Sequence, residues 1–407
     1  MKKIMAVFSL LISSNLLCVP KIFLQITKNF SEKAEIVLIF EVQKDNYWNK
    51  FIKVLSRDLE FSGYFDVEEA EIVKDIEKEK KKYTTEIVLT GKKEGNILKI
   101  KVEDNLEETI LFEKDYGIIS NASLLAHKIN NEIILKLTGK PGIAGSKILF
   151  VSGTLRKYQI YSIEYDGENL KKLTDFNFLV HYPRWLPQKG KIVFITYENG
   201  WPEIAKLDLK TGNRKIILSQ PGLNACVSPC KSTGEMAVVL SKSGNPEIYL
   251  ATFEGVIIKR LTYYRGIDSS PSFSPDGKLI AFVSDRQGNP QIYLMTRDGY
   301  RIRRISYISG YSTSPSFSPD GNFVAYVFAS GGNFGLALYN LKTGKTKIVG
   351  KYLGCEEISW GLDSRHIVYS KTDKTPNSLY IIDILTGERR RLTPGKISAF
   401  SPDWFSY

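Results

Sequence analysis

The side chains in this 407-residue sequence that are best suited to chemistry are its three histidines. His127, His181 and His366 lie far apart, in segments of different character, so their spacing is not that of a metal-ligand set or an acid–base pair. No nucleophile elbow, His-Glu-x-x-His motif or phosphate-binding glycine loop accompanies them. The sequence therefore predicts no catalysis, no metal site and no cofactor.

Cysteines and aspartates offer two further candidates. Cys226 and Cys230 flank a Ser-Pro pair and could form a disulfide, but two cysteines without neighbouring ligands do not make a zinc site. Asp276, Asp320 and Asp403 each follow Ser-Pro, where a carboxylate typically hydrogen-bonds to the backbone of its own turn. Because the same triplet recurs, we interpret these aspartates as structural.

The aspartate turns belong to a repeating unit, which is clearest in residues 269–306. There, short apolar runs are separated by turns rich in Pro, Gly, Asn and Asp, a pattern typical of antiparallel strands. One residue of the second run marks the same unit six times, at spacings of 43 to 45 residues: Phe150, Phe194, Val239, Phe282, Tyr326 and Tyr369. A period of this length with four strands per unit predicts a six-bladed β-propeller.

The two ends of the repeat region predict how the ring closes. The first unit begins directly at residues 147–150, which match the second strand of the other units. The piece that it lacks, with the sequence Phe-Ser-Pro-Asp, occurs near the end of the chain within residues 398–403. We therefore expect residues 141–407 to form a propeller whose first blade receives its innermost strand from the C-terminal segment, which removes an open sheet edge.

Residues 21–140 have a different pattern and predict a small α+β domain before the propeller. The expected elements are strands at 22–26, 35–40 and 65–67, a helix at 47–61, a charged helix from about residue 68, a hairpin at 86–102, a strand at 108–112 and a helix at 121–137. The predicted fold class is therefore mostly β, with a six-bladed propeller preceded by a small α+β domain.

Residues 1–20 have the pattern of a secretory signal, because Lys2 and Lys3 precede a short apolar stretch. We expect this segment to be removed on export, with lipid attachment at Cys18 as the alternative. The net charge of +12 would suit an anionic partner, but lysines are mixed with glutamates and no basic–aromatic motif is present. We therefore expect an exported, soluble protein that does not bind nucleic acid.

The N-terminal region and the repeats together resemble the TolB family, the periplasmic propeller proteins of the Tol–Pal system. The resemblance rests on residues 58–65, on the helix end at 134–139 and on the Ser-Pro-Asp-Gly repeats, and it covers nearly the whole chain. The third and sixth repeats depart from the pattern at 227–230 and 360–363. The resemblance implies a non-enzymatic, monomeric adaptor in the periplasm that reaches membranes only through its partners.

The resemblance also implies two partners. The peptidoglycan-associated lipoprotein Pal would dock at the mouth of the propeller channel. The inner-membrane protein TolA would bind the mature N-terminal segment, which includes Ile22, Phe23, Leu24, Gln25 and Ile26. Such an adaptor would help to maintain outer-membrane integrity and to constrict the outer membrane during cell division.

The loops that lead into the innermost strands are expected to surround the channel mouth. They hold more tyrosine and charged residues than turn geometry requires, and Tyr and Arg are typical interface anchors, although the tyrosines could merely cover the blade ends. The candidate partner-binding residues are His181, Tyr264, Arg265, Asp268, Tyr311 and Glu357. Two other functions stay open: an exported propeller that binds sugar or peptidoglycan without Tol partners, and a propeller with hydrolase activity.

Overall fold

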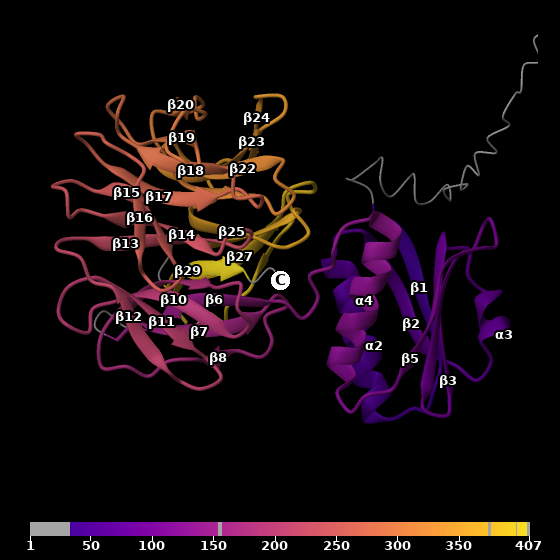
Figure 1. Cartoon of the computed structure of the whole chain (residues 1–407). Helices are drawn as coiled ribbons and strands as arrows, with labels where there is room; N and C mark the ends of the chain where they lie inside the picture. Colours follow the sequence, from indigo (N-terminus) through magenta and orange to yellow (C-terminus); the bar gives the residue numbers. More distant parts are fainter. Residues whose placement is uncertain (1–32, 154–156, 373–375, 396, 405–407) are drawn as a thin grey trace, which may run out of the picture.

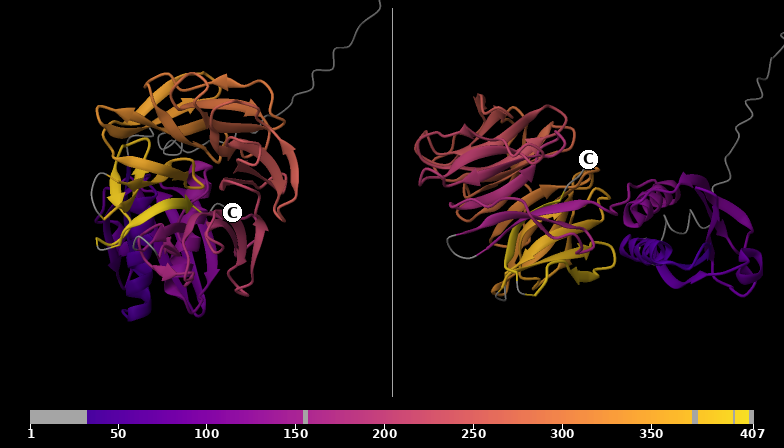
Figure 2. Two further views of the ribbon diagram at one scale, coloured as in Figure 1. Left: turned by 90° about the vertical axis from the view of Figure 1, so that its left-hand side faces the viewer. Right: turned by 90° about the horizontal axis from the view of Figure 1, so that it is seen from below.

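The computed structural model describes residues 33–153, 157–372, 376–395 and 397–404. An α+β part leads into a ring of six four-stranded sheets (Figure 1). Figure 2 shows the ring along its axis as a six-bladed β-propeller, so the predicted fold class is confirmed. The predicted strand at 22–26 and the predicted signal at 1–20 lie outside the described residues. None of the described helices combines the length and the apolar character that a bilayer span requires.

The N-terminal part is a five-stranded sheet with two helices packed on one face. The strands run in the order β2-β1-β3-β4-β5, and Figure 1 shows α2 and α4 between this sheet and the propeller. Leu38 and Phe40 of β1 join the core beneath the helices, whereas Val37 and Ile39 pack on the opposite face, as the two-residue period of a strand requires. The strands are β1 (Ala34–Glu41), β2 (Phe65–Ile72), β3 (Ile87–Glu94), β4 (Ile97–Asp104) and β5 (Thr109–Gly117).

The helices α2 (Asn46–Phe61) and α4 (Ala122–Thr138) lie close to their predicted positions. The side chain of Asp45 caps α2 by accepting a hydrogen bond from the Trp48 N–H at 2.9 Å. Asn121 caps α4 in the same way, through the N–H of Leu124 at 3.0 Å. Gly139 follows α4 with a φ of 68°, the left-handed conformation that glycine adopts readily and that commonly ends a helix.

One predicted element is wrong. The sequence predicted a charged helix from about residue 68, but residues 68–72 continue strand β2, and helix α3 spans only Ile76–Lys80. β2 lies at the edge of the sheet, parallel to β1, so its glutamates stay in water while the backbone pairs on one side. Pairing with β1 therefore overrides the local preference of a Glu-rich segment for a helix.

Each propeller blade is an antiparallel sheet whose strands succeed one another outward from the channel. Blades one to three are β29 (Ala399–Trp404), β6 (Lys147–Ser152), β7 (Gln159–Glu164), β8 (Lys171–Lys172); β9 (Val180–Trp185), β10 (Lys191–Thr196), β11 (Glu203–Asp208), β12 (Arg214–Leu218); and β13 (Asn224–Cys230), β14 (Glu235–Leu240), β15 (Glu247–Thr252), β16 (Ile257–Arg260). Blades four to six are β17 (Asp268–Phe273), β18 (Leu279–Ser284), β19 (Gln291–Thr296), β20 (Arg303–Arg304); β21 (Ser312–Phe317), β22 (Phe323–Ser330), β23 (Asn333–Asn340), β24 (Thr346–Gly350); and β25 (Cys355–Trp360), β26 (His366–Lys371), β27 (Ser378–Asp383), β28 (Arg389–Arg391).

The second strand of each blade forms the core of the propeller. The six residues whose spacing predicted the repeat all lie on these strands and are completely buried: Phe150, Phe194, Val239, Phe282, Tyr326 and Tyr369. Each packs between its own blade and a neighbour, as in the cluster that joins Phe282 to Cys230 and Val239 of the preceding blade. The period was therefore visible in the sequence because one core position recurs in every blade.

The ring closes as predicted, by pairing between the first and last strands of the propeller. β29 runs antiparallel to β6, with Ala399 opposite Ser152. The indole N–H of the buried Trp404 donates a hydrogen bond to Ser146 Oγ at 2.8 Å, and its backbone N–H donates to Ser359 Oγ of blade six at 2.9 Å. The last strand thus completes blade one and fastens it to blade six.

The register of the closing strand differs from the prediction. Asp403 takes the position that Ser272 has in blade four, not the position of the turn residue Asp276. Its carboxylate accepts a hydrogen bond from the N–H of Trp185 in blade two at 2.7 Å. Asp276 and Asp320 do accept hydrogen bonds within their own turns. The prediction of a turn aspartate is therefore confirmed for those two and wrong for Asp403.

Deleting residues 397–407 should leave β6 as an open edge and remove the buried Trp404. We expect the melting temperature, measured by scanning calorimetry, to fall by several degrees, because loss of one buried Trp side chain typically costs about 3–5 kcal/mol. The matched pair Trp404→Ala and Trp201→Ala separates closure from tryptophan loss as such, since Trp201 is 54% exposed and should cost less than about 1 kcal/mol. An unchanged melting curve for the truncated chain would contradict this account of closure.

Candidate functional site

The innermost strands enclose a central channel with a cavity of about 440 Å³. All six blades contribute to its wall, including blade one through Asp403 and Trp404. Lys231, Pro275 and Pro319, which lie in the turns between the first and second strands, also line it. The cavity therefore occupies the half of the channel that is nearer to these turns. A concave site with convergent polar groups is the usual form of a binding pocket.

One residue in each innermost strand has the left-handed backbone that non-glycine residues seldom adopt. Its φ lies between 42° and 55° in every blade, and the strand pairing shifts register beside it, which marks a β-bulge. This conformation costs about 1–2 kcal/mol per residue. Because it recurs in all six blades, we infer that the inner strands need the bulge at this position. We call these residues the channel ring: Tyr182, Cys226, Ser270, Ser314, Glu357 and Ser401.

Two carboxylates in the channel hold neighbouring blades together. Glu357 accepts hydrogen bonds from the Ser401 backbone N–H at 2.6 Å and from its hydroxyl at 3.0 Å. Asp403 accepts the N–H of Trp185, and its other oxygen lies 3.9 Å from Arg184 Nε. Through these two groups the closing strand is joined to blade six on one side and to blade two on the other.

The environment of the cavity shifts the pKa values of several groups. The charge of Glu357, together with burial, raises the pKa of the Tyr182 phenol well above its ordinary range. Burial raises the pKa of the Cys226 thiol and of the Asp403 carboxyl, and it lowers the pKa of the Lys231 ammonium. Cys226 and Cys230 are both free thiols, so the disulfide that their spacing permitted is not formed. At neutral pH Tyr182 and Cys226 thus offer the cavity neutral polar groups.

The predicted partner-binding residues on the loops lie at the opposite end of the channel, where the chain enters the inner strands. Arg265 is exposed and Tyr311 is partly exposed. The ring of Tyr264 packs against the guanidinium of Arg286, 5.3 Å from the ring centroid. His181 lies on β9 among aromatic rings, and burial lowers its pKa.

The other two predicted residues have different roles. Asp268 is completely buried and accepts two hydrogen bonds from Arg286, at 3.0 and 2.8 Å, so it supports a loop instead of presenting its side chain to a partner. Glu357 belongs to the channel ring and lines the cavity. The structure therefore does not gather the six predicted residues into one site, because most lie at the loop end and Glu357 lies inside the channel.

Sequence reasoning missed two sets of residues that share the period of the blades. The channel ring was overlooked, although in four blades its residue directly precedes Pro-x-Phe or Pro-x-Trp. Tyr263 and Tyr307, at the same position of the loop end, are strongly exposed, and so is Tyr352, which lies two residues nearer to its inner strand. The first two rings stack on Arg260 and Arg304, at 4.5 and 4.8 Å. Alignment of the units on the strand after the loop would have revealed the channel ring and the pair Tyr263 and Tyr307.

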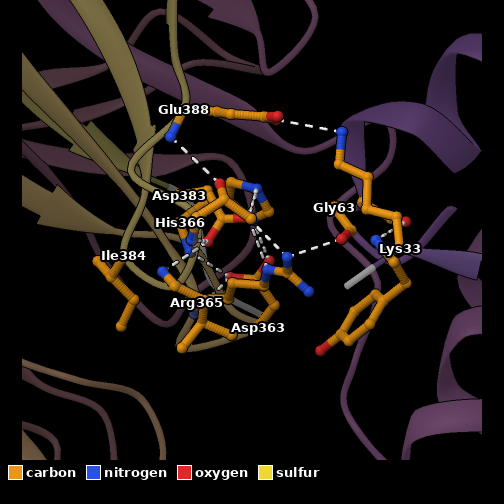
Figure 3. Close-up of polar contacts among 12 residues, drawn as sticks. Lys33, Gly63, Asp363, Arg365, His366, Asp383, Ile384 and Glu388 are labelled. Carbon is orange, nitrogen blue, oxygen red and sulfur yellow. Dashed lines mark hydrogen bonds and ion pairs between the residues drawn. The ribbon is translucent and has the colours of Figure 1, made fainter. Parts of the chain in front are cut away.

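The N-terminal part contacts the end of the propeller that holds the cavity, over blades six and one. Arg365, in the turn before β26, donates from Nη2 to the carbonyl of Gly63 at 2.7 Å and pairs with Asp383 at the same distance (Figure 3). Gly63 has a φ of 77°, and a Cβ there would lie 2.6 Å from Arg365 Nη2, so a side chain would not fit. Lys33 reaches Glu388 at 3.2 Å. These contacts tie the two parts together over one sector of the ring.

A closed propeller with a hollow polar channel defines a class of binding scaffold, in which a rigid ring presents a pocket to a partner. Residues 134–407 match the family model described as "TolB beta propeller domain". That match covers more than half of the chain, so the chain belongs to the TolB family.

Individual relatives agree with this assignment. The chain is 34% identical to "Protein TolB homolog" of Chlorobium chlorochromatii over 42% of this chain and 39% of that protein. It is 30% identical to "Tol-Pal system protein TolB" of Desulfosudis oleivorans over 40% of this chain and 38% of that protein. The matched part thus spans less than two fifths of the length of these curated relatives. The crystal structure of TolB from Acinetobacter baumannii superposes with a TM-score of 0.81 at 25% identity, covering 92% of this chain and 97% of that one.

The family assignment also bears on catalysis. The relatives are named as TolB and as a component of the Tol–Pal system, whose components are not enzymes, so the chain is grouped with non-enzymatic proteins. The arrangement of His366 agrees with a structural role. Its Nδ1 lies 2.6 Å from the Asp363 carboxylate, and both side chains are buried.

Arg365→Ala should remove the hydrogen bond to Gly63 that joins the two parts, and it should destabilise the chain, because it leaves Asp383 buried without its partner, which typically costs about 3–5 kcal/mol. Burial alone would raise the pKa of the Asp383 carboxyl, but Arg365 and His366 hold this pKa below its ordinary value. The stability that the ionised Asp383 gives the folded chain is therefore present above about pH 4 and is lost as the pH falls further. The difference in unfolding free energy between the intact chain and the variant should shrink below that pH.

Denaturant titrations at pH 7 and pH 3 measure this difference. Arg265→Ala is the matched control, because this exposed arginine lies at the opposite end of the ring and should change stability by less than about 0.5 kcal/mol. If Arg365→Ala lowered the unfolding free energy no more than the control does, the Arg365–Asp383 pair would not contribute to stability and this account would be wrong.

Proposed function

We propose that this chain is the periplasmic adaptor of a Tol–Pal system and that a Pal-like lipoprotein inserts a polar segment into the channel cavity. The cavity is the observation that carries the proposal, because it is concave, lined by every blade and bordered by charged and hydroxyl groups. The N-terminal part contacts this end through blades six and one, so part of the rim stays free (Figure 2). The similarity to a protein named as a Tol–Pal system component supports the proposal.

The chemistry of the cavity wall suits a protein loop. Ser270 and Ser314 of the channel ring carry hydroxyl groups, Tyr182 carries a neutral phenol, and Arg184 adds a cation. The hydroxyl and phenol groups both donate and accept hydrogen bonds, and the guanidinium donates, which matches the mixed polarity of an exposed loop. A volume of about 440 Å³ suits several side chains of such a loop, whereas a folded domain would remain outside on the rim.

The loop end of the ring is the second candidate docking surface. It carries three of the residues proposed from the sequence, Tyr264, Arg265 and Tyr311. The exposed Tyr263 and Tyr307 enlarge it, and their stacking on arginines limits the side-chain entropy that binding would remove. Interface energy often concentrates in Tyr and Arg, so this surface needs a direct test beside the cavity.

We further propose that the segment with Ile22, Phe23, Leu24, Gln25 and Ile26 binds a TolA-like inner-membrane protein. Family membership supports this role, and the segment lies outside the described residues. The chain would be exported by a signal within residues 1–20 and act as a monomer in the periplasm. By connecting the two envelope proteins it would maintain outer-membrane integrity and help constriction during cell division.

Ser314→Tyr tests the cavity. Blade two already holds Tyr182 at the equivalent ring position, so the backbone accommodates this side chain, which would fill part of the cavity. We expect the affinity for the Pal-like lipoprotein of the same organism to fall at least about tenfold, or about 1.4 kcal/mol, in calorimetric titrations. Tyr300→Ala is the control, because this exposed tyrosine lies in an outer turn away from the channel and should leave affinity unchanged.

The same titrations decide between the two ends of the ring. If the partner docks in the cavity, Arg265→Ala and Tyr311→Ala should bind it as the unaltered chain does. A loss of about 1–3 kcal/mol in these two variants, with no effect of Ser314→Tyr, would place the partner at the loop end. Equal affinity for every variant would contradict docking on the propeller and favour the N-terminal part.

Assays for hydrolysis address the remaining alternatives. With no nucleophile and base in position among the described channel residues, we expect no cleavage of peptide, ester or glycoside substrates above the blank. Activity that co-purifies with the chain and disappears in Tyr182→Phe would contradict the adaptor function. Peptidoglycan fragments that bind in the cavity and compete with the lipoprotein would favour the sugar-binding alternative.

A further inference from the structure

His127, treated above as an isolated histidine, is held in a fixed orientation between the two parts of the chain. It lies on α4, and its Nδ1 is 2.6 Å from Asp58 Oδ2 on α2. Because a carboxylate only accepts, Nδ1 carries the hydrogen in this bond. Asp58 also accepts the hydroxyl hydrogen of Tyr165, from blade one, at 2.6 Å. The side chain of Asp58 is completely buried and that of His127 is only 8% exposed, so neither can turn freely.

The other ring nitrogen of His127 is directed at acidic residues of blade one. Nε2 lies 3.9 Å from Glu164 Oε2, beyond hydrogen-bonding distance. One ligand atom each from His127, Glu164 and Asp166 lie within 4.8 Å of one another. Within the described part of the chain, neither Nε2 of His127 nor the carboxylate of Glu164 makes a hydrogen bond. An imidazole nitrogen and a carboxylate thus face each other without a hydrogen bond between them, and both have lone pairs that a ligand could use.

The charges around His127 leave a negative excess. The carboxylates of Asp58, Glu164 and Asp166 surround His127, and the guanidiniums of Arg57 and Arg390 lie beside them. With a neutral imidazole, three negative and two positive charges leave a net charge of −1. The carboxylate of Glu168 is 66% exposed and lies at the edge of this cluster, in water. A bound cation would offset the negative excess.

We propose that His127, Glu164 and Asp166 bind a divalent cation of the zinc type, which links the N-terminal part to the first propeller blade. Zinc takes imidazole nitrogen at about 2.0–2.1 Å and carboxylate oxygen at about 2.0–2.2 Å, so its ligand atoms lie about 3.3 Å apart. The 3.9 Å between Nε2 and Glu164 Oε2 needs only a small contraction to reach that spacing. Water would complete the coordination.

The surroundings of the three ligands match those of metal-binding histidines elsewhere. A ligating imidazole usually donates the N–H of its second nitrogen to a carboxylate, which sets the tautomer and the ring orientation. The carboxylate of Asp58 accepts such a hydrogen bond from Nδ1 of His127. Asp166 also accepts hydrogen bonds from Arg57 and from the Glu168 N–H, which fixes its carboxylate while leaving lone pairs. An imidazole ligand favours zinc over calcium and magnesium, which prefer oxygen ligands only.

The competing arrangement is a protonated His127 that forms an ion pair with Glu164. It would satisfy the same two groups without a metal and would need no bound ion. Proton and metal exclude each other at Nε2, so a single titration distinguishes the two states.

The test is a calorimetric titration of the full chain, without an affinity tag and after removal of metals with EDTA, with ZnCl₂ at pH 7.5. We expect one ion per chain, a higher melting temperature with Zn²⁺ and reversal of that shift by EDTA. Glu164→Gln should weaken binding at least about tenfold, because loss of even an outer-shell partner typically weakens metal binding 10–100-fold. Glu168→Gln is the matched control in the same turn and should keep the affinity of the unaltered chain, since its carboxylate is 66% exposed and lies outside the three ligands.

Two outcomes would overturn the proposal. Absence of zinc binding to the unaltered chain would favour the protonated His127. Equal zinc affinity of the unaltered chain and Glu164→Gln would place the ion elsewhere. A comparison that needs no variant is the titration of the unaltered chain with CaCl₂, where binding as tight as that of zinc would exclude an imidazole ligand and would also contradict the proposed site.

Discussion

The pairing of β29 with β6 is the constraint on which the rest of the propeller depends. It turns a row of sheets into a ring, and the residues behind it, among them Phe150, Val368 and Trp404, form one apolar cluster across the first and last blades. The hydrogen bonds of Asp403 and Ser401 extend the closure to both neighbouring blades. The channel, its cavity and the channel ring therefore exist only in the closed state, which makes the last strand part of the site as well as of the scaffold.

Much of the fold was visible in the sequence because its signals are local and periodic. The core position marked by Phe150 and Phe282 recurs in every blade, and the caps of α2 and α4 follow from Asp45 and Asn121. The two errors involve non-local pairing. Residues 68–72 form a strand because β1 lies beside them, and the Phe-Ser-Pro-Asp of the closing strand repeats the letters of a turn but has the bulged register of an inner strand.

The site could be predicted less well, because its properties depend on contacts between distant residues. Loop composition indicated an interface but could not show that Arg286 keeps Asp268 buried, nor that Glu357 lies within the channel. The bulges that place the channel ring follow from strand pairing, and their sequence signal, the Pro-x-Phe or Pro-x-Trp after the ring residue in four blades, lies in the strands and not in the loops. The contact between Arg365 and Gly63 joins positions 302 residues apart, so the end of the ring that carries the N-terminal part could not be inferred.

The position of the N-terminal part across the junction of blades six and one has a consequence for folding. Phe61 of α2 packs against Arg390 of blade six, 4.1 Å from its ring centroid, and against Tyr165 of blade one, and Arg390 donates to the Tyr165 carbonyl at 2.5 Å. Partners so distant in sequence meet late, because loop-closure entropy must be overcome first. At a synthesis rate of about 5–20 residues per second, β6 waits on the order of 10–50 s for β29. During that interval the unpaired edge of β6 is where the chain is most exposed to misassociation, and the N-terminal part, made early from local contacts, is already present beside it.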